Sequence, residues 1–267
     1  MQYEQRFKTK YYIEVKRYNT ERTYTPGESR GERVEPTREE QVAVNDRHRA
    51  EYLRMLIDTN FEPGDILLTL TERNRDATFD EIKSALTLFQ ARVRRIYRKH
   101  NIVLKSLYVY EIGSRGARHV HMLLSNIPDT RVLAQCWNRG YTDIKHLDDT
   151  GQYEGIAAYF VKYYKKTREY FRKENRTGLK RWYSSRNLAK PDIEKRPVYS
   201  RRVSKSIGEA HWRRRGYILD KDSVRSGICE YNGQEFFEFR VINQHPDKPP
   251  HRRRKKKKKR QRGGGDG

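Results

Sequence analysis

The clearest pattern of hydrophobic and polar positions along the chain predicts a helix that begins just after Thr78. Thr78 and Glu81 have the spacing of a capping box, in which each side chain accepts a hydrogen bond from the backbone N–H of the other residue. Apolar residues then recur in steps of four and three, which places them on one helical face. They are Ile82, Leu86, Phe89, Val93 and Ile96.

Three further helices are predicted at residues 38–57, 129–137 and 153–166. Strands are predicted where β-branched and aromatic residues gather between turn residues, at residues 10–18, 65–71, 104–112, 117–125, 141–147, 217–220 and 235–242. The stretch "GSRG" at residues 113–116 contains two glycines and suits the turn of a hairpin. Pro191 and Pro197 are expected to interrupt regular structure after the last helix.

This order of elements predicts an α+β fold with a central antiparallel sheet flanked by helices. We divide the chain into an N-terminal strand, polar loop and helix (residues 1–58), a core (59–170), a basic and aromatic extension with late strands (171–245) and a tail (246–267). The polar loop contains Pro26, Gly27, Gly31 and Pro36. The tail holds a block of like charges, which predicts disorder.

Net charge narrows the class of partner. The chain of 267 residues has a formal charge of +24, and +14 remains when the ten Lys and Arg of residues 252–262 are set aside. So strong a positive charge favours a polyanion, above all nucleic acid. The alternatives are an anionic membrane surface and a structural protein bound to ribosomes. The basic tail is expected to raise non-specific affinity for DNA.

The two cysteines, Cys136 and Cys229, form no metal-binding pattern, and a reducing cytoplasm is the simpler expectation for them. The N-terminus lacks the apolar run of a signal peptide, and no apolar stretch is long enough to span a membrane. We therefore expect a cytoplasmic protein of a bacterial host without a membrane partner. The nucleus would apply only in a eukaryotic host.

The stretch "HVHMLL" places two histidines on one side of a predicted strand. His119 and His121 share a face because side chains alternate along a strand. Folding of the hairpin would bring Glu111 beside them. Two imidazoles and one carboxylate can bind a divalent metal and leave positions open for substrate. The alternative is a pair of surface histidines on an exposed strand.

The stretch "YFVKYYKK" places tyrosine and lysine side chains on one arc of a predicted helix. Tyr159, Lys162, Tyr163 and Lys166 lie beside an apolar arc that can bury against a sheet. A phenol has a pKa of about 10, and a neighbouring ammonium group favours the phenolate. Such a pair of phenols suits attack on a phosphodiester. The alternative is an amphipathic helix with half-buried tyrosines.

Aromatic and cationic residues alternate through residues 181–215, a composition typical of surfaces that bind nucleic acid. A solvated basic surface is the alternative. The candidate contacts are Arg181, Trp182, Arg201, Arg202, Trp212, Arg213 and Arg214.

Three stretches in this order, "LLTLT", "HVHMLL" and "YFVKYYKK", resemble the motifs of the HUH superfamily of rolling-circle replication initiators. The resemblance spans residues 59–166 and is greatest to initiators of single-stranded DNA phages and bacterial plasmids, including the filamentous-phage gene II type. It implies a ferredoxin/RRM-like sheet and a tyrosine that nicks one strand of origin DNA, remains joined to the 5′ phosphate and leaves a 3′ hydroxyl for the host polymerase. A second cut then closes the displaced strand into a circle.

Transferred by position, the resemblance implies that His119, His121 and Glu111 hold Mg²⁺ or Mn²⁺. Tyr159 would be the first nucleophile and, in a two-tyrosine enzyme, Tyr163 the second. Lys162 and Lys166 would stabilise the phosphate or the phenolate. The chain contains no GxxxxGK[ST] phosphate loop, so strand separation is expected to need a host helicase.

Other classes share parts of this pattern. A non-catalytic RRM-like module that binds nucleic acid explains the charge and the aromatic residues. A metal phosphodiesterase that uses activated water would leave no protein–DNA adduct. A transposase or conjugative relaxase would share the chemistry in another biological setting. Nothing in the sequence indicates an oligomeric state.

Overall fold

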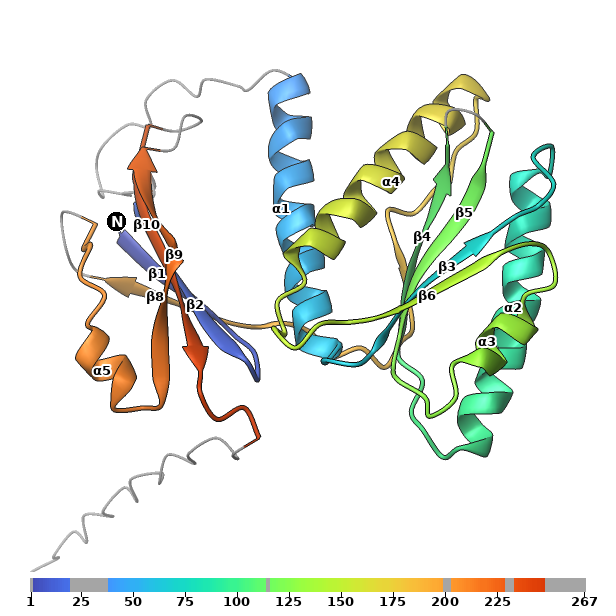
Figure 1. Ribbon diagram of the computed structural model, residues 1–267. Helices are drawn as coiled ribbons and strands as arrows, with labels where there is room; N and C mark the ends of the chain where they lie inside the picture. Colours follow the sequence, from blue (N-terminus) through green and yellow to red (C-terminus); the bar gives the residue numbers. More distant parts are fainter. Residues whose placement is uncertain (1, 20–37, 114–115, 199–202, 229–232, 248–267) are drawn as a thin grey trace, which may run out of the picture.

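The computed structural model describes residues 2–19, 38–113, 116–198, 203–228 and 233–247. Within them the chain forms two antiparallel sheets on either side of a long central helix, α1 (Arg38–Asn60), as Figure 1 shows. The predicted α+β class and antiparallel sheet are confirmed. The predicted polar loop at residues 20–37, the two arginines Arg201 and Arg202, and the tail from residue 248 lie outside the described residues.

The first sheet has the strand order β6-β3-β5-β4-β7. Its strands are β3 (Ile66–Thr71), β4 (Ser106–Ile112), β5 (Arg118–Leu124), β6 (Thr142–His146) and β7 (Tyr183–Ser184). The predicted hairpin is present, because β4 pairs antiparallel with β5 and the N–H of Gly113 donates to the carbonyl of Ala117 at 2.7 Å. Only the short strand β7 was not predicted.

Helices cover both faces of this sheet. On one face lie α2 (Phe79–Lys99) and α3 (Arg131–Cys136), and on the other lie α1 and α4 (Glu154–Lys173). The capping box at the start of α2 is confirmed, since Glu81 N donates to Thr78 Oγ1 at 3.3 Å and Thr78 N donates to Glu81 Oε2 at 2.7 Å. The predicted apolar stripe of α2 is buried against the sheet as far as Val93, and Tyr97 then takes the buried position beside Ile96.

The second sheet joins the two ends of the chain. Its order is β8-β1-β2-β10-β9, and the short helix α5 (Glu209–Arg213) packs on it through Trp212. The strands are β1 (Gln2–Lys8), β2 (Tyr12–Asn19), β8 (Asp192–Val198), β9 (Tyr217–Ile228) and β10 (Glu235–Asn243). The predicted late strands are confirmed, whereas β1 and β8 were missed. Pro197 does not interrupt β8, because β8 is an edge strand, where proline removes no required hydrogen bond.

The central helix α1 contacts both sheets. Leu53 and Ile57 belong to the core of the first sheet, whereas Met55 packs against Phe7 and Tyr12 of the second. A helix buried from two sides needs no single apolar stripe, which explains the weak hydrophobic periodicity of this segment. In the described residues no helix is both long enough and apolar enough to cross a membrane.

The buried carboxylate of Asp58 ties α1 to two other elements. Asp58 accepts hydrogen bonds from the hydroxyl of Tyr12 in β2 and, at 2.8 Å, from the backbone N–H of Tyr153 at the start of α4. Burial raises the pKa of Asp58 to about 6 although these donors oppose the shift. The start of α4 is therefore fixed to the junction between the two sheets.

Three arginines surround one buried glutamate in the second sheet. The register sets Arg17 and Arg196 directly opposite Glu4 on its two neighbouring strands, and Arg6 follows two residues along β1. Their guanidinium groups lie 2.8, 2.5 and 2.8 Å from the carboxylate. Burial alone would raise the pKa of Glu4, but the bonds and charges of the arginines lower it from 4.5 to about 2.

Replacing Glu4 by Gln should lower the free energy of unfolding by ~1–3 kcal/mol at neutral pH, since three arginines lose their counter-charge. Because the folded-state pKa is depressed, this stabilisation is complete above pH 4.5 and disappears as the pH falls through about 2. Denaturant unfolding of both proteins at several pH values measures it. Glu194→Gln, which breaks an exposed pair with Lys8, is the control and should cost under ~1 kcal/mol. A Glu4→Gln penalty that persisted at pH 2 would contradict this account.

Candidate active site

The polar half of one sheet face holds the candidate site. His119 and His121 of β5 lie on the face that α1 and α4 cover, because Leu123 two residues on packs in that core. The register sets Glu111 of β4 and Thr71 of β3 directly opposite His119, on its two sides. Sequence alternation predicted the shared face of the histidines, and the hairpin register brings the carboxylate beside them.

Glu111 links the sheet to α4. Its Oε2 lies 2.8 Å from His121 Nε2, and its Oε1 accepts a hydrogen bond from Lys166 Nζ at 2.6 Å. Burial alone would raise the pKa of Glu111, but the bonds from His121 and Lys166 outweigh it and lower the pKa to about 2. The carboxylate is therefore charged throughout the neutral range.

Two threonines orient the histidine rings from the neighbouring strand. Thr69 Oγ1 lies 3.1 Å from His121 Nδ1, and Thr71 Oγ1 lies 3.1 Å from His119 Nδ1. A partner at one ring nitrogen fixes the ring and directs the other nitrogen to its own partner. Both threonines belong to the "LLTLT" stretch, whose role the sequence did not reveal. The signal would have been the alternation of Thr69 and Thr71 on a strand that pairs with the histidine strand.

The donor set suits a divalent cation in kind, because it combines two oriented imidazoles with one ionised carboxylate. His119, His121 and Glu111 would hold such an ion. In the described part of the chain, no three His, Cys, Asp or Glu side chains are arranged to hold a metal ion as they stand. Glu111 bonds instead to His121 and Lys166. The metal set stays a prediction.

Two tyrosines of α4 stack in a column above His121. The Tyr163 ring lies nearly parallel to the His121 ring, with centroids 4.0 Å apart and an interplanar angle of 12°. The Tyr159 ring stacks on Tyr163 at 6.0 Å, and its side chain is 57% exposed. The predicted helical arc therefore faces the histidine strand, with the outer phenol at the surface and the inner one half-buried.

The ammonium groups take different places from those predicted for them. Lys166 lies 5.6 Å from the centre of the Tyr163 ring but donates its hydrogen bond to Glu111. Burial and then the charge of Glu111 raise the pKa of the Tyr163 phenol, and Lys166 only partly opposes them. Lys162 is exposed. In this arrangement Lys166 serves the carboxylate more than the phenolate.

The hydroxyl of Thr167 sets the position of α4 along the sheet. Thr167 is fully buried, accepts from the N–H of Ile112 at 3.1 Å and donates to the carbonyl of Tyr110 at 2.7 Å. These two backbone groups flank Glu111 on β4. The tyrosines, one turn away on the same helix, are therefore held at a fixed distance from the carboxylate and histidines. No pattern in the sequence indicated this role.

The residues predicted to bind nucleic acid do not gather at this site. Arg181 pairs with Asp46 of α1 at 2.9 Å, and Trp182 stacks on Tyr52 at 6.5 Å, so both help to fix α1. Trp212 is only 4% exposed and belongs to the core of the second sheet. Because a ring that stacks on a base needs a free face, the structure corrects the interpretation of Trp212 to a structural one. The two exposed arginines beside it are Arg213 and Arg214.

Comparison with known proteins bears on this geometry. The model of a family described as replication-associated protein, of the ORF2 and gene II protein type, matches residues 65–168. The match begins at β3 and ends within α4, so it contains every residue of the candidate active site. It confirms the resemblance to a replication initiator and supports a role in DNA replication. No curated protein and no solved structure matches the chain significantly.

Replacing Thr167 by Val should lower the free energy of unfolding by ~1–3 kcal/mol, because the buried N–H of Ile112 and carbonyl of Tyr110 lose their partner. Thr167→Ser keeps the hydroxyl and should cost less than half as much. Thermal or denaturant unfolding measures both. Equal losses in the two variants would show that the methyl group, and not the hydroxyl, holds α4.

Proposed function

We propose that the chain is a rolling-circle replication initiator of the HUH type, which nicks one DNA strand by tyrosine attack and later rejoins it. The observation that carries the proposal is the column of His121, Tyr163 and Tyr159 beside the Glu111–Lys166 pair. It combines nucleophiles, imidazoles and a paired carboxylate at one site. The match of residues 65–168 to a replication-associated family supports the same conclusion.

The proposed reaction is a transesterification. The phenolic oxygen of a tyrosine bonds to phosphorus, and the bond from phosphorus to the 3′ oxygen breaks. The phenol loses its proton and the leaving 3′ oxygen gains one. One phosphodiester replaces another, so the energy of the bond is kept in the 5′-phosphotyrosine link. The free 3′ hydroxyl can serve as a primer and can later attack the link in the reverse reaction.

The two tyrosines differ in their readiness to act. The side chain of Tyr159 is mostly exposed, so an extended strand can reach its hydroxyl. Tyr163 lies beneath it, and burial raises the pKa of its phenol. This difference supports Tyr159 as the first nucleophile and Tyr163 as the second, which would act once the first is occupied. Lys162 is placed on the exposed side of the same helix, where it can neutralise a phosphate.

A divalent ion, Mg²⁺ or Mn²⁺, would supply charge stabilisation at a non-bridging phosphate oxygen. The chain's own contribution is to hold the imidazoles through Thr69 and Thr71 and to keep Glu111 ionised through Lys166. We propose the host helicase and polymerase as partners in strand separation and extension.

The direct test is transfer of label from DNA to protein. Single-stranded oligonucleotides tiled across the replicon that encodes the protein, labelled at their 3′ ends, are incubated with Mn²⁺ or with chelator and analysed on a denaturing protein gel. Label that moves to the protein only with metal supports tyrosyl transfer. Cleavage without an adduct would indicate activated water, and binding without cleavage would indicate a non-catalytic module.

Tyr159→Phe should reduce adduct formation at least ~10²-fold, because the exposed nucleophile is lost. Tyr163→Phe should form the first adduct but fail to rejoin strands, as measured by the yield of circular single strands. Tyr141→Phe, which removes another exposed phenol, is the control and should behave as the unchanged protein. A Tyr159→Phe protein with full adduct yield would assign the first attack to another residue.

His121→Ala should lower the rate of cleavage by ~10²-fold or more, since a charge-stabilising group at the reacting phosphate is removed. Its affinity for single-stranded DNA, measured by fluorescence anisotropy at several salt concentrations, should stay within a factor of two or three. The control is His100→Ala, an exposed histidine at the end of α2. Parallel loss of binding and cleavage in the His121 variant alone would point to a binding role instead.

A further inference from the structure

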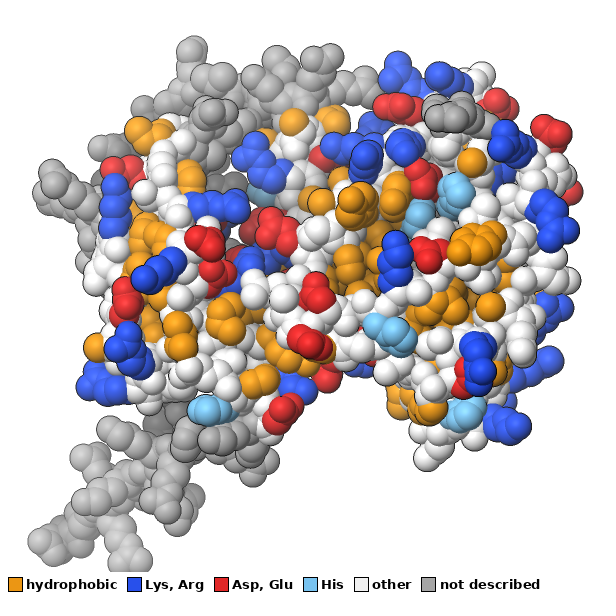
Figure 2. All heavy atoms as spheres, in the orientation of Figure 1, with side chains coloured by type: hydrophobic (Ala, Val, Ile, Leu, Met, Phe, Trp, Pro, Cys, Tyr) orange, Lys and Arg blue, Asp and Glu red, His pale blue; other side chains and the backbone are white. Residues whose placement is uncertain are grey.

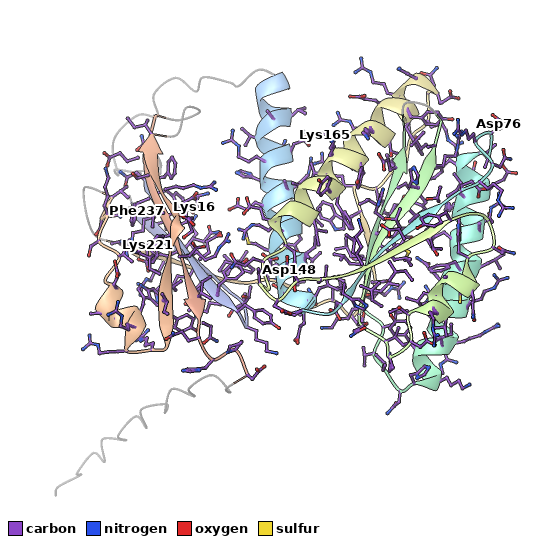
Figure 3. All side chains as sticks on the ribbon, viewed as in Figure 1. Lys16, Asp76, Asp148, Lys165, Lys221 and Phe237 are labelled. Carbon is purple, nitrogen blue, oxygen red and sulfur yellow. The ribbon has the colours of Figure 1, made fainter. Side chains whose placement is uncertain are left out.

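A second basic surface lies on the side of α4 that faces α1. The two helices contact each other through Leu53 and Phe160 and then diverge, as Figure 1 shows. Between them is a hollow of about 920 Å³, which we call the α1–α4 groove. Its lining residues are Val42, Ala43, Asp46, Arg47, Ala50, Val161, Lys165, Arg168 and Arg172. Figure 3 shows Lys165 projecting from α4 into this gap.

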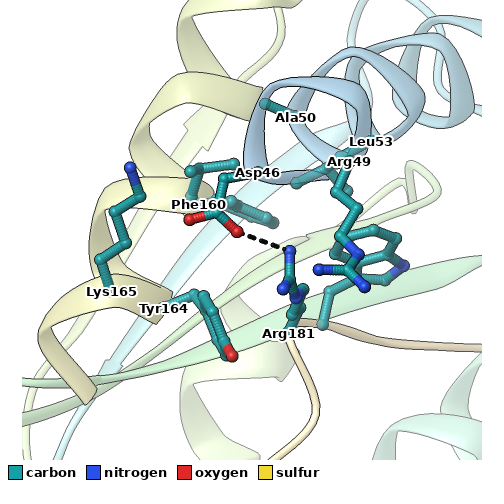
Figure 4. A pocket seen from close by; sticks show the side chains of 10 residues that line it. Asp46, Arg49, Ala50, Leu53, Phe160, Tyr164, Lys165 and Arg181 are labelled. Atoms are coloured by element: carbon teal, nitrogen blue, oxygen red, sulfur yellow. Dashed lines mark hydrogen bonds and ion pairs between the residues drawn. The ribbon is translucent and has the colours of Figure 1, made fainter. Parts of the chain in front are cut away.

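The cations of the groove lack acidic partners in the described part of the chain. Arg47, Lys165, Arg168 and Arg172 are exposed, and none of them lies within 4 Å of a described carboxylate. Asp46, the only acid among the lining residues, already pairs with Arg181 at 2.9 Å (Figure 4). In Figure 2, Lys and Arg side chains gather over the diverging ends of α1 and α4. This concave surface therefore carries positive charge that the described residues do not neutralise.

Elsewhere the same chain pairs its concave cations. In the cleft between α1 and the second sheet, Arg54 and Arg240 both bond to Glu14, and Lys16 lies near Glu51 and Glu238. The contrast distinguishes the α1–α4 groove from the general basicity of the surface. A hollow that gathers cations of one sign and excludes acids favours binding of a polyanion.

We propose that the α1–α4 groove binds the sugar–phosphate backbone of single-stranded DNA, outside the nicking site. Lys165, Arg168 and Arg172 follow one side of α4 over seven residues, or about 10.5 Å at 1.5 Å per residue, which is long enough for more than one phosphate. A duplex is too wide to enter between two helices that touch at one end. A single strand is not.

Aromatic side chains at the inner end of the groove support a single strand. A smaller hollow shares Asp46, Ala50, Val161 and Lys165 with the groove and is lined further by Tyr164 and Trp182, whose rings are half-buried. Figure 4 shows Tyr164 beside Arg181, whose guanidinium lies 5.6 Å from the ring centre. Aromatic and guanidinium planes next to a basic track are the usual means of binding unpaired bases.

This inference rests on the proposed function for its choice of DNA as the polyanion. The groove and the tyrosine column lie on opposite flanks of one helix, which is about 10–12 Å across. A strand held in the groove would keep a neighbouring segment near Tyr159 and so raise its effective concentration there. The groove would then serve the strand that has been or will be cut.

The test compares two proteins of equal charge. The groove variant carries Lys165→Gln, Arg168→Gln and Arg172→Gln. The control variant carries Lys83→Gln, Arg95→Gln and Arg98→Gln, three exposed residues of α2 on the opposite face of the sheet. Both are made with Tyr159→Phe to prevent covalent capture. Binding of a fluorescent mixed-sequence 20-mer, single-stranded or duplex, is measured by anisotropy between 0.05 and 0.5 M salt, after thermal unfolding has shown both variants to be folded.

We expect the groove variant to reduce the slope of log K against log [salt] for the single strand by about 2, at ~0.7 per lost phosphate contact. The affinity should fall about 100-fold at 0.1 M salt, with a much smaller change for the control. Equal losses in the two variants would overturn the groove, and a loss confined to the duplex would overturn the single strand as its occupant. Because the readout is binding, it is independent of the adduct assay, which alone tests the proposed function.

Discussion

The hydrogen bonds of Thr167 to the backbone of β4 are the constraint on which the candidate site depends. Half of the site is on the sheet and half is on α4, so its geometry exists only if the helix keeps one position along the strand. Thr167 bonds to the residues on both sides of Glu111, and Asp58 fixes the other end of the helix at Tyr153. Between these two anchors the helix presents Tyr159 and Tyr163 to His121. Neither anchor touches the reacting groups as proposed, yet both decide where those groups lie.

Local patterns were enough to predict the elements that carry the site. The capping box and stripe of α2, the hairpin of β4 and β5, and the shared face of His119 and His121 all follow from spacing within a short window. What could not be predicted depends on contacts between distant segments. Glu4 meets Arg196 only because β1 pairs with β8, and no pattern in either strand names its partner. Thr167 bonds to backbone groups, which leave no mark in the sequence. Trp182 and Trp212 occupy similar basic stretches, but only the fold decides that one is half-buried and the other lies in a core.

Buried carboxylates and surface cations follow different rules in this chain. Glu4, Glu14 and Glu111 are each bonded to at least two cationic or imidazole groups, and these partners keep them charged although burial opposes the charge. The same carboxylates hold together elements from opposite ends of the chain. The large positive charge that remains is left to exposed residues and is available to an anionic partner.

The helix α4 unites these features, since three of its sides serve different ends. One side is buried through Ala157, Phe160 and Thr167, one presents the tyrosine column, and one lines the α1–α4 groove with cations. A change that shifted the helix along β4 would therefore move the nucleophiles and the proposed DNA track together, whereas a change on either exposed side would affect only one of them. This arrangement explains why Thr167 is threonine and not another apolar residue of the buried side: the shared position of both surfaces rests on a directional bond, which non-directional packing cannot supply.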